Sequence, residues 1–170
     1  MNRHVNAIAG RLSLRPPQRR SLEILDRITE IVPPKKGVDP QAALTAIGSE
    51  FPTVSDFERD FPSLCFALAT GVGKTRLMGA FISYLHLAHG FSNFFVLAPN
   101  LTIYNKLTTD FTPNTPKYVF QGIAEFAVTP PEIITGDNYE TGRGIRQKGY
   151  LPGVEWERPV HINILSLIHI

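Results

Sequence analysis

Residues 64–75 read Leu64-Cys65-Phe66-Ala67-Leu68-Ala69-Thr70-Gly71-Val72-Gly73-Lys74-Thr75, and this stretch decides the fold. Its first five residues form a continuous apolar run, which is typical of a strand buried on both faces of a parallel sheet. After Thr75, apolar residues recur at helical spacing up to Gly90, and glycine commonly follows the last residue of a helix. We therefore predict a buried strand over 64–68, a glycine-rich turn, and a helix that ends near Gly90.

A second apolar run, 94–98, follows and predicts another buried strand. Pro99-Asn100 ends this strand, and Asn100 can cap a helix that runs from Leu101 to about Asp110. The order strand, helix, strand, helix is that of a βαβ unit. The sequence therefore predicts an α/β fold with a parallel sheet.

The chain on either side of this unit is predicted to form short elements. Upstream, we expect helices over 17–31 and 40–50 and one or two helical turns over 54–60. Residues 37–69 hold five acidic residues and one basic residue, so 35–62 is interpreted as a solvated insertion. Downstream we expect strands at 118–120, 133–134 and 161–168, and a glycine-rich basic loop at 142–149.

The composition is that of an ordinary globular protein. Of 170 residues, 43% are hydrophobic and 19% are charged, and the net charge is +2, which excludes a disordered or polybasic tail protein. A single cysteine, Cys65, excludes an intramolecular disulfide and fits a reducing compartment. No apolar run approaches the roughly 20 residues that span a bilayer. We therefore expect a soluble cytoplasmic protein with no membrane partner.

The glycine-rich turn has the composition of a phosphate-binding loop. Gly71 and Gly73 allow the backbone to approach a phosphate closely, and the start of the following helix directs N–H groups at the anion. Lys74 would reach the β- and γ-phosphates of a nucleotide, and the Thr75 hydroxyl would complete the coordination of Mg²⁺. The alternative is a glycine-rich turn with an exposed lysine.

Three motifs resemble those of superfamily 2 helicases, which include the DEAD- and DEAH-box proteins. Residues 69–75, A-T-G-V-G-K-T, are similar to motif I, and 96–102, V-L-A-P-N-L-T, are similar to motif Ia. Residues 14–18, L-R-P-P-Q, resemble the upstream glutamine element. The P-N-L-T variant of motif Ia resembles most closely the restriction subunits of type III restriction–modification systems. This resemblance implies a P-loop NTPase fold, in which 1–170 is the N-terminal part of the first RecA-like domain.

The resemblance also implies the cofactors and the roles of individual residues. ATP and Mg²⁺ would be held by Gln18, which binds the adenine, and by Thr70, Gly71, Val72, Gly73, Lys74, Thr75 and Arg76. Lys74 and Thr75 would be the catalytic residues, and Thr75 would bind Mg²⁺. Pro99, Asn100 and Leu101 would lie along the nucleic-acid backbone. The implied activity is that of an ATP-dependent DNA helicase or translocase, with double-stranded DNA and a methyltransferase (modification) subunit as partners.

Part of the family's machinery is absent from the sequence. The D-E-x-H box, which completes Mg²⁺ binding and orients the attacking water, does not occur. Residues 165–170 equal the in-frame translation of a transposon-end adapter used for sequencing libraries, so we expect that they are an artefact. The chain is therefore predicted to be a fragment that is inactive alone, with a nuclease domain possible downstream. The alternatives are another, kinase-like P-loop NTPase and a nucleotide- or DNA-binding module that does not hydrolyse ATP.

Overall fold

The computed structural model describes residues 2–139 and 160–166 of the chain. The basic loop expected at 142–149 lies outside these residues, as do the last residues, 167–170. The elements in chain order are α1 (Arg3–Arg11), α2 (Pro16–Ile31), α3 (Pro40–Glu50), α4 (Lys74–His89), β1 (Asn93–Ala98), α5 (Leu101–Phe111), α6 (Ala124–Val128), β2 (Glu132–Ile134) and β3 (His161–Ser166).

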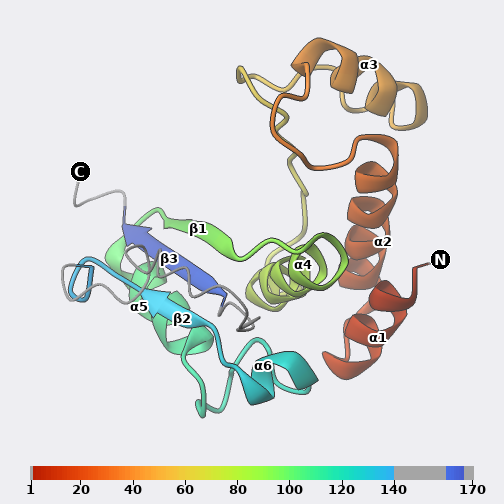
Figure 1. Ribbon diagram of the computed structural model, residues 1–170. Helices are drawn as coiled ribbons and strands as arrows, with labels where there is room; N and C mark the ends of the chain where they lie inside the picture. The colour runs from red at the N-terminus through yellow and green to blue at the C-terminus, as the bar shows by residue number, and fades with distance from the viewer. Residues whose placement is uncertain (1, 140–159, 167–170) are drawn as a thin grey trace, which may run out of the picture.

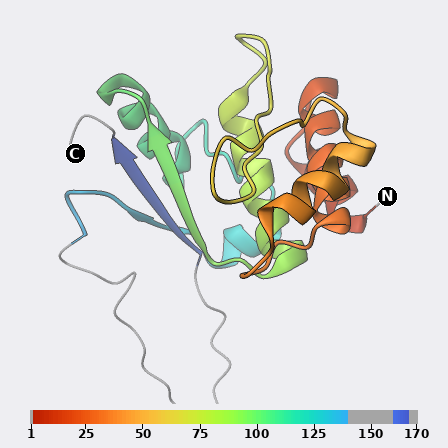
Figure 2. The ribbon, with the colours of Figure 1, turned by 90° about the horizontal axis from the view of Figure 1, so that it is seen from above.

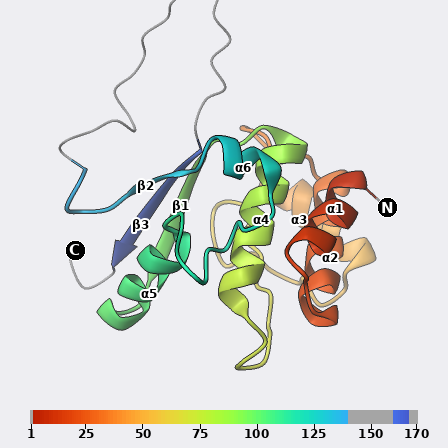
Figure 3. The ribbon, with the colours of Figure 1, turned by 90° about the horizontal axis from the view of Figure 1, so that it is seen from below.

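Helix α4, which follows the glycine-rich turn, lies in the middle of the molecule (Figure 1). The sheet and α5 lie on one side of α4, and α1 and α2 lie on the other, as the views from above and below also show (Figures 2 and 3). Helix α3 packs near the end of α2 that is farther from α1. The helix that follows the glycine-rich turn is therefore held between a helical layer and the sheet.

The sheet has three strands in the order β1-β3-β2, and both strand pairs are parallel. Phe94 pairs with Ile162 and Val96 with Ile164, while Ile133 of β2 pairs with Ile162 from the other side. Ile162 and Ile164 of the central strand are completely buried. The predicted α/β fold with a parallel sheet is confirmed.

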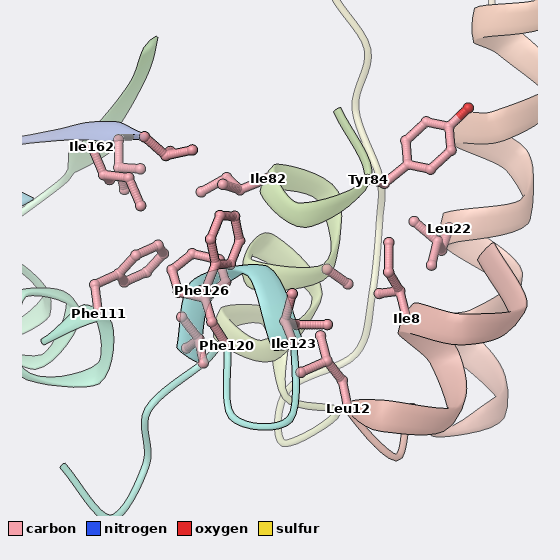
Figure 4. Packing of buried hydrophobic residues seen from close by; sticks show 14 of the residues in the cluster. Ile8, Leu12, Leu22, Ile82, Tyr84, Phe111, Phe120, Ile123, Phe126 and Ile162 are labelled. Carbon is pink, nitrogen blue, oxygen red and sulfur yellow. The ribbon is translucent and has the colours of Figure 1, made fainter. Parts of the chain in front are cut away.

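An aromatic cluster fills the space between the sheet and α4 (Figure 4). Phe120 meets Phe111 and Phe126 edge to face, with ring centroids 5.5 and 4.7 Å apart. All three rings are at most 2% exposed. Complete burial of a side chain of this size contributes roughly 1.5–3 kcal/mol. This cluster fixes the position of α4, and therefore of the loop that precedes it.

The strand predicted over 64–68 is wrong, because this run has no regular secondary structure and joins no ladder. Phe66 packs edge to face on Phe81 of α4, with centroids 4.9 Å apart, and Leu64 packs on a separate cluster near α3. Cys65, expected inside the strand, is exposed. An apolar run needs a neighbouring strand to become a ladder, and among the described residues β1, β2 and β3 pair only with one another.

The outcome for the flanking elements is mixed. The helices expected over 17–31, 40–50 and 101–110 are confirmed, as are the strand at 133–134 and the described part of 161–168. The strand at 118–120 is wrong, because Tyr118 lies in a turn and donates its N–H to the Thr115 carbonyl at 3.1 Å. The helical turns over 54–60 are also wrong, and the short helices α1 and α6 were not predicted.

The segment interpreted as an insertion has a small core of its own. Ala43 and Ile47 of α3 pack with Ile28 of α2 and with Phe57, and these four residues are at most 6% exposed. Arg27 of α2 forms an ion pair with Glu50 at 2.8 Å on the surface beside this core. The side-chain hydrogen bonds that Arg27 donates to the Glu50 carboxylate raise the pKa of Arg27 above its usual value. Residues 40–57 are thus attached to the outer part of α2, away from the sheet.

Candidate nucleotide-binding site

The turn before α4 has a backbone conformation that favours glycine at two positions. Gly71 and Gly73 have φ angles of +79° and +90°, in the left-handed region that favours glycine. Gly73 is the N-cap of α4, so Lys74 and Thr75 lie in the first helical turn. The first N–H groups of a helix have no carbonyl partner within it and face outward at its N-terminus. These N–H groups and the helix dipole favour an anion at this position.

Two side chains from the start of α2 hold the loop. The Gln18 side chain, only 2% exposed, donates from Nε2 to the Gly73 carbonyl at 2.9 Å. Its Oε1 accepts from the Arg15 N–H at 2.8 Å. The Arg15 guanidinium donates to the Gly71 carbonyl at 3.3 Å. Both glycine carbonyls are thus turned toward α2.

This arrangement sets the direction of the loop N–H groups. In a trans peptide the carbonyl and the next N–H point in opposite directions. The Gly71 carbonyl faces Arg15, and the Gly73 carbonyl accepts from Gln18 and also from the Leu77 N–H of α4 at 3.2 Å. The N–H groups of Val72 and Lys74 therefore point away from these partners. Glycine at 73 also leaves room for the Gln18 amide, since a Cβ there would lie 2.7 Å from Gln18 Nε2 and would displace it.

The predicted phosphate-binding side chains have different environments. Lys74 is exposed and Thr75 is partly buried, so both keep some contact with solvent. Thr70 is exposed and Val72 is partly buried. The Arg76 guanidinium donates to the Leu12 carbonyl at 2.8 Å, which directs it toward the end of α1. Sequence reasoning grouped Arg76 with the phosphate ligands, and the structure places it in a contact between α4 and the α1–α2 turn.

Buried polar contacts fix α2 against α4. The Tyr84 hydroxyl donates to the Asp26 carboxylate at 2.8 Å and lies 2.8 Å from the Thr29 hydroxyl. Asn2, the N-cap of α1, donates to the same carboxylate at 3.0 Å. Burial is the main cause that raises the pKa of Tyr84 to about 12. Because α2 also carries Gln18, these contacts help to keep the loop in place.

The segment predicted to meet nucleic acid follows the carboxyl end of β1. Pro99, Asn100 and Leu101 are exposed, and Leu101 is the first residue of α5. The Asn100 side-chain oxygen accepts from the Ile103 N–H at 2.9 Å and caps the helix. Its amide N–H groups therefore remain the donors available to a phosphate. In open parallel sheets, ligands bind beyond the carboxyl ends of the strands, which is where this segment lies.

Sequence reasoning missed one cation near the loop. Lys106 of α5 places Nζ 3.4 Å from the Thr75 hydroxyl oxygen and also contacts the Asp110 carboxylate. The spacing of Lys106 and Asp110 predicts a helical ion pair, but nothing in the sequence places that pair beside Thr75. The packing of α5 near α4 brings the two residues together.

The comparison with family models decides which family the chain represents. The model described as "Type III restriction enzyme, res subunit" matches residues 11–149, most of the chain. The chain belongs to this family. The matched range includes Gln18, the glycine-rich loop and the segment 99–101. No curated protein and no solved structure gives a significant match.

Membership of the res-subunit family fixes the fold and the general activity. The family is one of P-loop NTPases, so the chain is part of a RecA-like ATP-binding domain. Its domain is a helicase-like module, and the general activity is ATP hydrolysis. Within residues 2–139 and 160–166, no group of three or more His, Cys, Asp or Glu residues could hold a metal ion. No helix in these residues is long and apolar enough to cross a membrane.

Proposed function

We propose that residues 70–75 bind the triphosphate of ATP and that the chain is the ATP-binding part of a DNA translocase, the restriction subunit of a type III restriction–modification system. The observation that carries the proposal is the loop backbone. Its two glycine carbonyls are held by Gln18 and Arg15, which leaves the N–H groups of Val72 and Lys74 on the other side. This polarity supports binding of an anion rather than a cation.

The side chains around the loop support specific roles. The exposed Lys74 ammonium would neutralise the β- and γ-phosphates, and the Thr75 hydroxyl would be the protein ligand of Mg²⁺. Mg²⁺ supplies charge neutralisation of the phosphates when it is bound. The Gln18 amide holds Gly73, and its contact with adenine is part of the proposal. Because the sequence has no D-E-x-H box, we expect that the chain binds ATP but does not hydrolyse it efficiently.

The proposed nucleic-acid contact is made by Pro99, Asn100 and Leu101. Their exposure and their place at the carboxyl end of β1 support it, together with the two amide N–H groups that Asn100 keeps free of the cap. The proposed partners are double-stranded DNA and a methyltransferase subunit. The cytoplasm is the proposed location.

The test is to measure ATP affinity of the wild-type chain and of Lys74→Ala by calorimetry in the presence of Mg²⁺. Loss of the ammonium should weaken binding at least tenfold, or about 1.4 kcal/mol. Lys117→Ala is the matched control, because Lys117 is exposed and lies in the turn after α5. Equal ATP affinity of wild type and Lys74→Ala, or no binding by wild type, would contradict the proposed nucleotide site.

A second measurement separates the proposal from its alternatives. The same preparations are assayed for ATP turnover with and without duplex DNA. We expect no turnover that depends on Lys74. Turnover that Lys74→Ala abolishes would contradict the prediction of an inactive chain, and phosphoryl transfer to a small acceptor would favour a kinase-like enzyme.

A further inference from the structure

Lys106 lies in a position that the formation of α5 does not explain. It belongs to the second turn of that helix, and Nζ is 3.4 Å from the hydroxyl oxygen of Thr75 at the start of α4. The same ammonium contacts the Asp110 carboxylate. The Lys106 side chain is 49% exposed, whereas that of Asp110 is 8% exposed. A half-exposed cation is thus held beside the glycine-rich loop by a buried anion.

The ion pair is poorly suited to stabilising the helix. In an i, i+4 pair the favourable order places the acid nearer the N-terminus, and here Lys106 precedes Asp110. Asp110 also lies in the last turn of α5, where the helix dipole disfavours a negative charge. Burial of a carboxylate adds a desolvation cost. The pair is better explained as a way to position Lys106, because Asp110 holds the Lys106 ammonium near Thr75.

The donors of Lys106 leave room for a ligand. A lysine ammonium has three N–H donors. Two are directed at Asp110 and Thr75, and among the described residues no other hydrogen-bond partner of Lys106 occurs. The third donor is available to an oxygen atom bound near the start of α4. An anion there would be near Lys106 and also near the first turn of α4, which carries Lys74.

We propose that Lys106 is a second phosphate-binding cation of the nucleotide site, delivered by α5 and positioned by Asp110. This inference rests on the proposed function, since it needs a nucleotide at the loop. The position beside Thr75 also determines when Lys106 matters most. Mg²⁺ bound to the Thr75 hydroxyl would repel the ammonium, so the contribution of Lys106 is largest when Mg²⁺ is absent.

The experiment measures ATP affinity of the full chain by calorimetry, once with Mg²⁺ and once with EDTA. In EDTA, Lys106→Met should weaken ATP binding about tenfold, because one of two cations near the phosphates is lost. With Mg²⁺ the loss should be smaller, about threefold. Lys106→Arg keeps the charge and should retain most of the affinity in EDTA. Lys117→Met removes the same charge elsewhere and should leave both affinities unchanged.

Competition with inorganic pyrophosphate and with adenosine separates a phosphate contact from a structural role. Lys106→Met should lower the affinity of pyrophosphate as a competitor of ATP and leave the affinity of adenosine unchanged. The inference is overturned if Lys106→Met binds ATP in EDTA with wild-type affinity. It is also overturned if the affinities of pyrophosphate and adenosine fall equally. In either case ATP binding that depends on Lys74 leaves the proposed function intact. Wild-type chain that binds no ATP overturns both.

Discussion

Two turns lead into helices near the proposed nucleotide site, and they are held in different ways. The turn 98–100 leaves β1, which is paired with β3 along its whole length, and Asn100 caps α5 with its own side chain. The turn 69–73 leaves a run without regular secondary structure, and its Gly73 cap has no side chain. Its support comes from Gln18 and Arg15, more than fifty residues earlier in the chain.

The difference shows where each turn gets its shape. The turn after β1 is determined locally, by a strand and a capping residue that are adjacent in sequence. The glycine-rich turn depends on α2, which the contacts of Tyr84 with Asp26 and Thr29 hold against α4. Substitutions in α2 should therefore alter nucleotide affinity even though they change no residue of the loop. Substitutions at Asn100 should leave nucleotide affinity unchanged.

The largest effect is expected for Gly73→Ala. The residue has φ of +90°, and a Cβ would lie 2.7 Å from Gln18 Nε2, so the loop loses either its conformation or its bond to Gln18. A non-glycine residue in this region costs roughly 1–2 kcal/mol before any clash is counted. We expect ATP affinity to fall more than tenfold, as measured by calorimetry, with a lower midpoint of urea unfolding.

Gly37→Ala is the matched control for that substitution. Gly37 has φ of +77°, and a Cβ there would meet no atom within 4 Å. Because of its backbone strain, this variant should have a lower midpoint of urea unfolding, but it should keep wild-type ATP affinity. Equal ATP affinities of the two variants would mean that the close approach of Gln18 to Gly73 has no role in the site.

A smaller loss is expected for Gln18→Ala. The substitution leaves the Arg15 N–H without its acceptor and removes the side chain that holds the Gly73 carbonyl. Each of these part-buried hydrogen bonds contributes roughly 0.5–1.5 kcal/mol. ATP affinity should fall about tenfold, and that of pyrophosphate should fall as well, because the loop backbone is affected. If only adenosine-containing ligands lose affinity, Gln18 binds the base and does not act through the loop.

The smallest effect is expected for Asn100→Ala, which tests the other turn. Removal of an N-cap side chain costs about 1 kcal/mol of stability. The midpoint of urea unfolding should decrease, and ATP affinity should stay within about twofold of wild type, because β1 still fixes the turn. A loss of ATP affinity as large as that of Gln18→Ala would show that the two turns are not independent.

Much of the fold could be predicted from sequence because its signals are local. The helices α2, α3 and α5 each have an apolar periodicity and a proline or Asn100 at the start, and all three were predicted correctly. The run 64–68 has an equally strong local signal, but a strand needs a partner. That partner depends on residues far away in sequence, so the prediction failed. Helix α1 had a usable signal in the spacing of Val5, Ile8, Ala9 and Leu12, all buried.

The same limit applies to the candidate site. The sequence indicates the loop residues 70–75, because the requirement for glycine followed by lysine and threonine is local. It also indicates Gln18, through the resemblance, but assigns it to adenine alone. The bond from Gln18 to Gly73 and the approach of Lys106 to Thr75 depend on how α2 and α5 pack around α4. Such contacts have no signature in a single sequence.

The missing ladder at 64–68 has a consequence for hydrogen exchange. The amide hydrogens of the central strand β3, and those of β1 that face β3, are bonded between paired strands, so their exchange requires separation of the sheet. Those of 64–69 join no ladder and can exchange through local opening, at a small fraction of the free energy of global unfolding. The glycine-rich loop thus continues from a segment of low local stability, which a bound ligand would order at the expense of its own affinity.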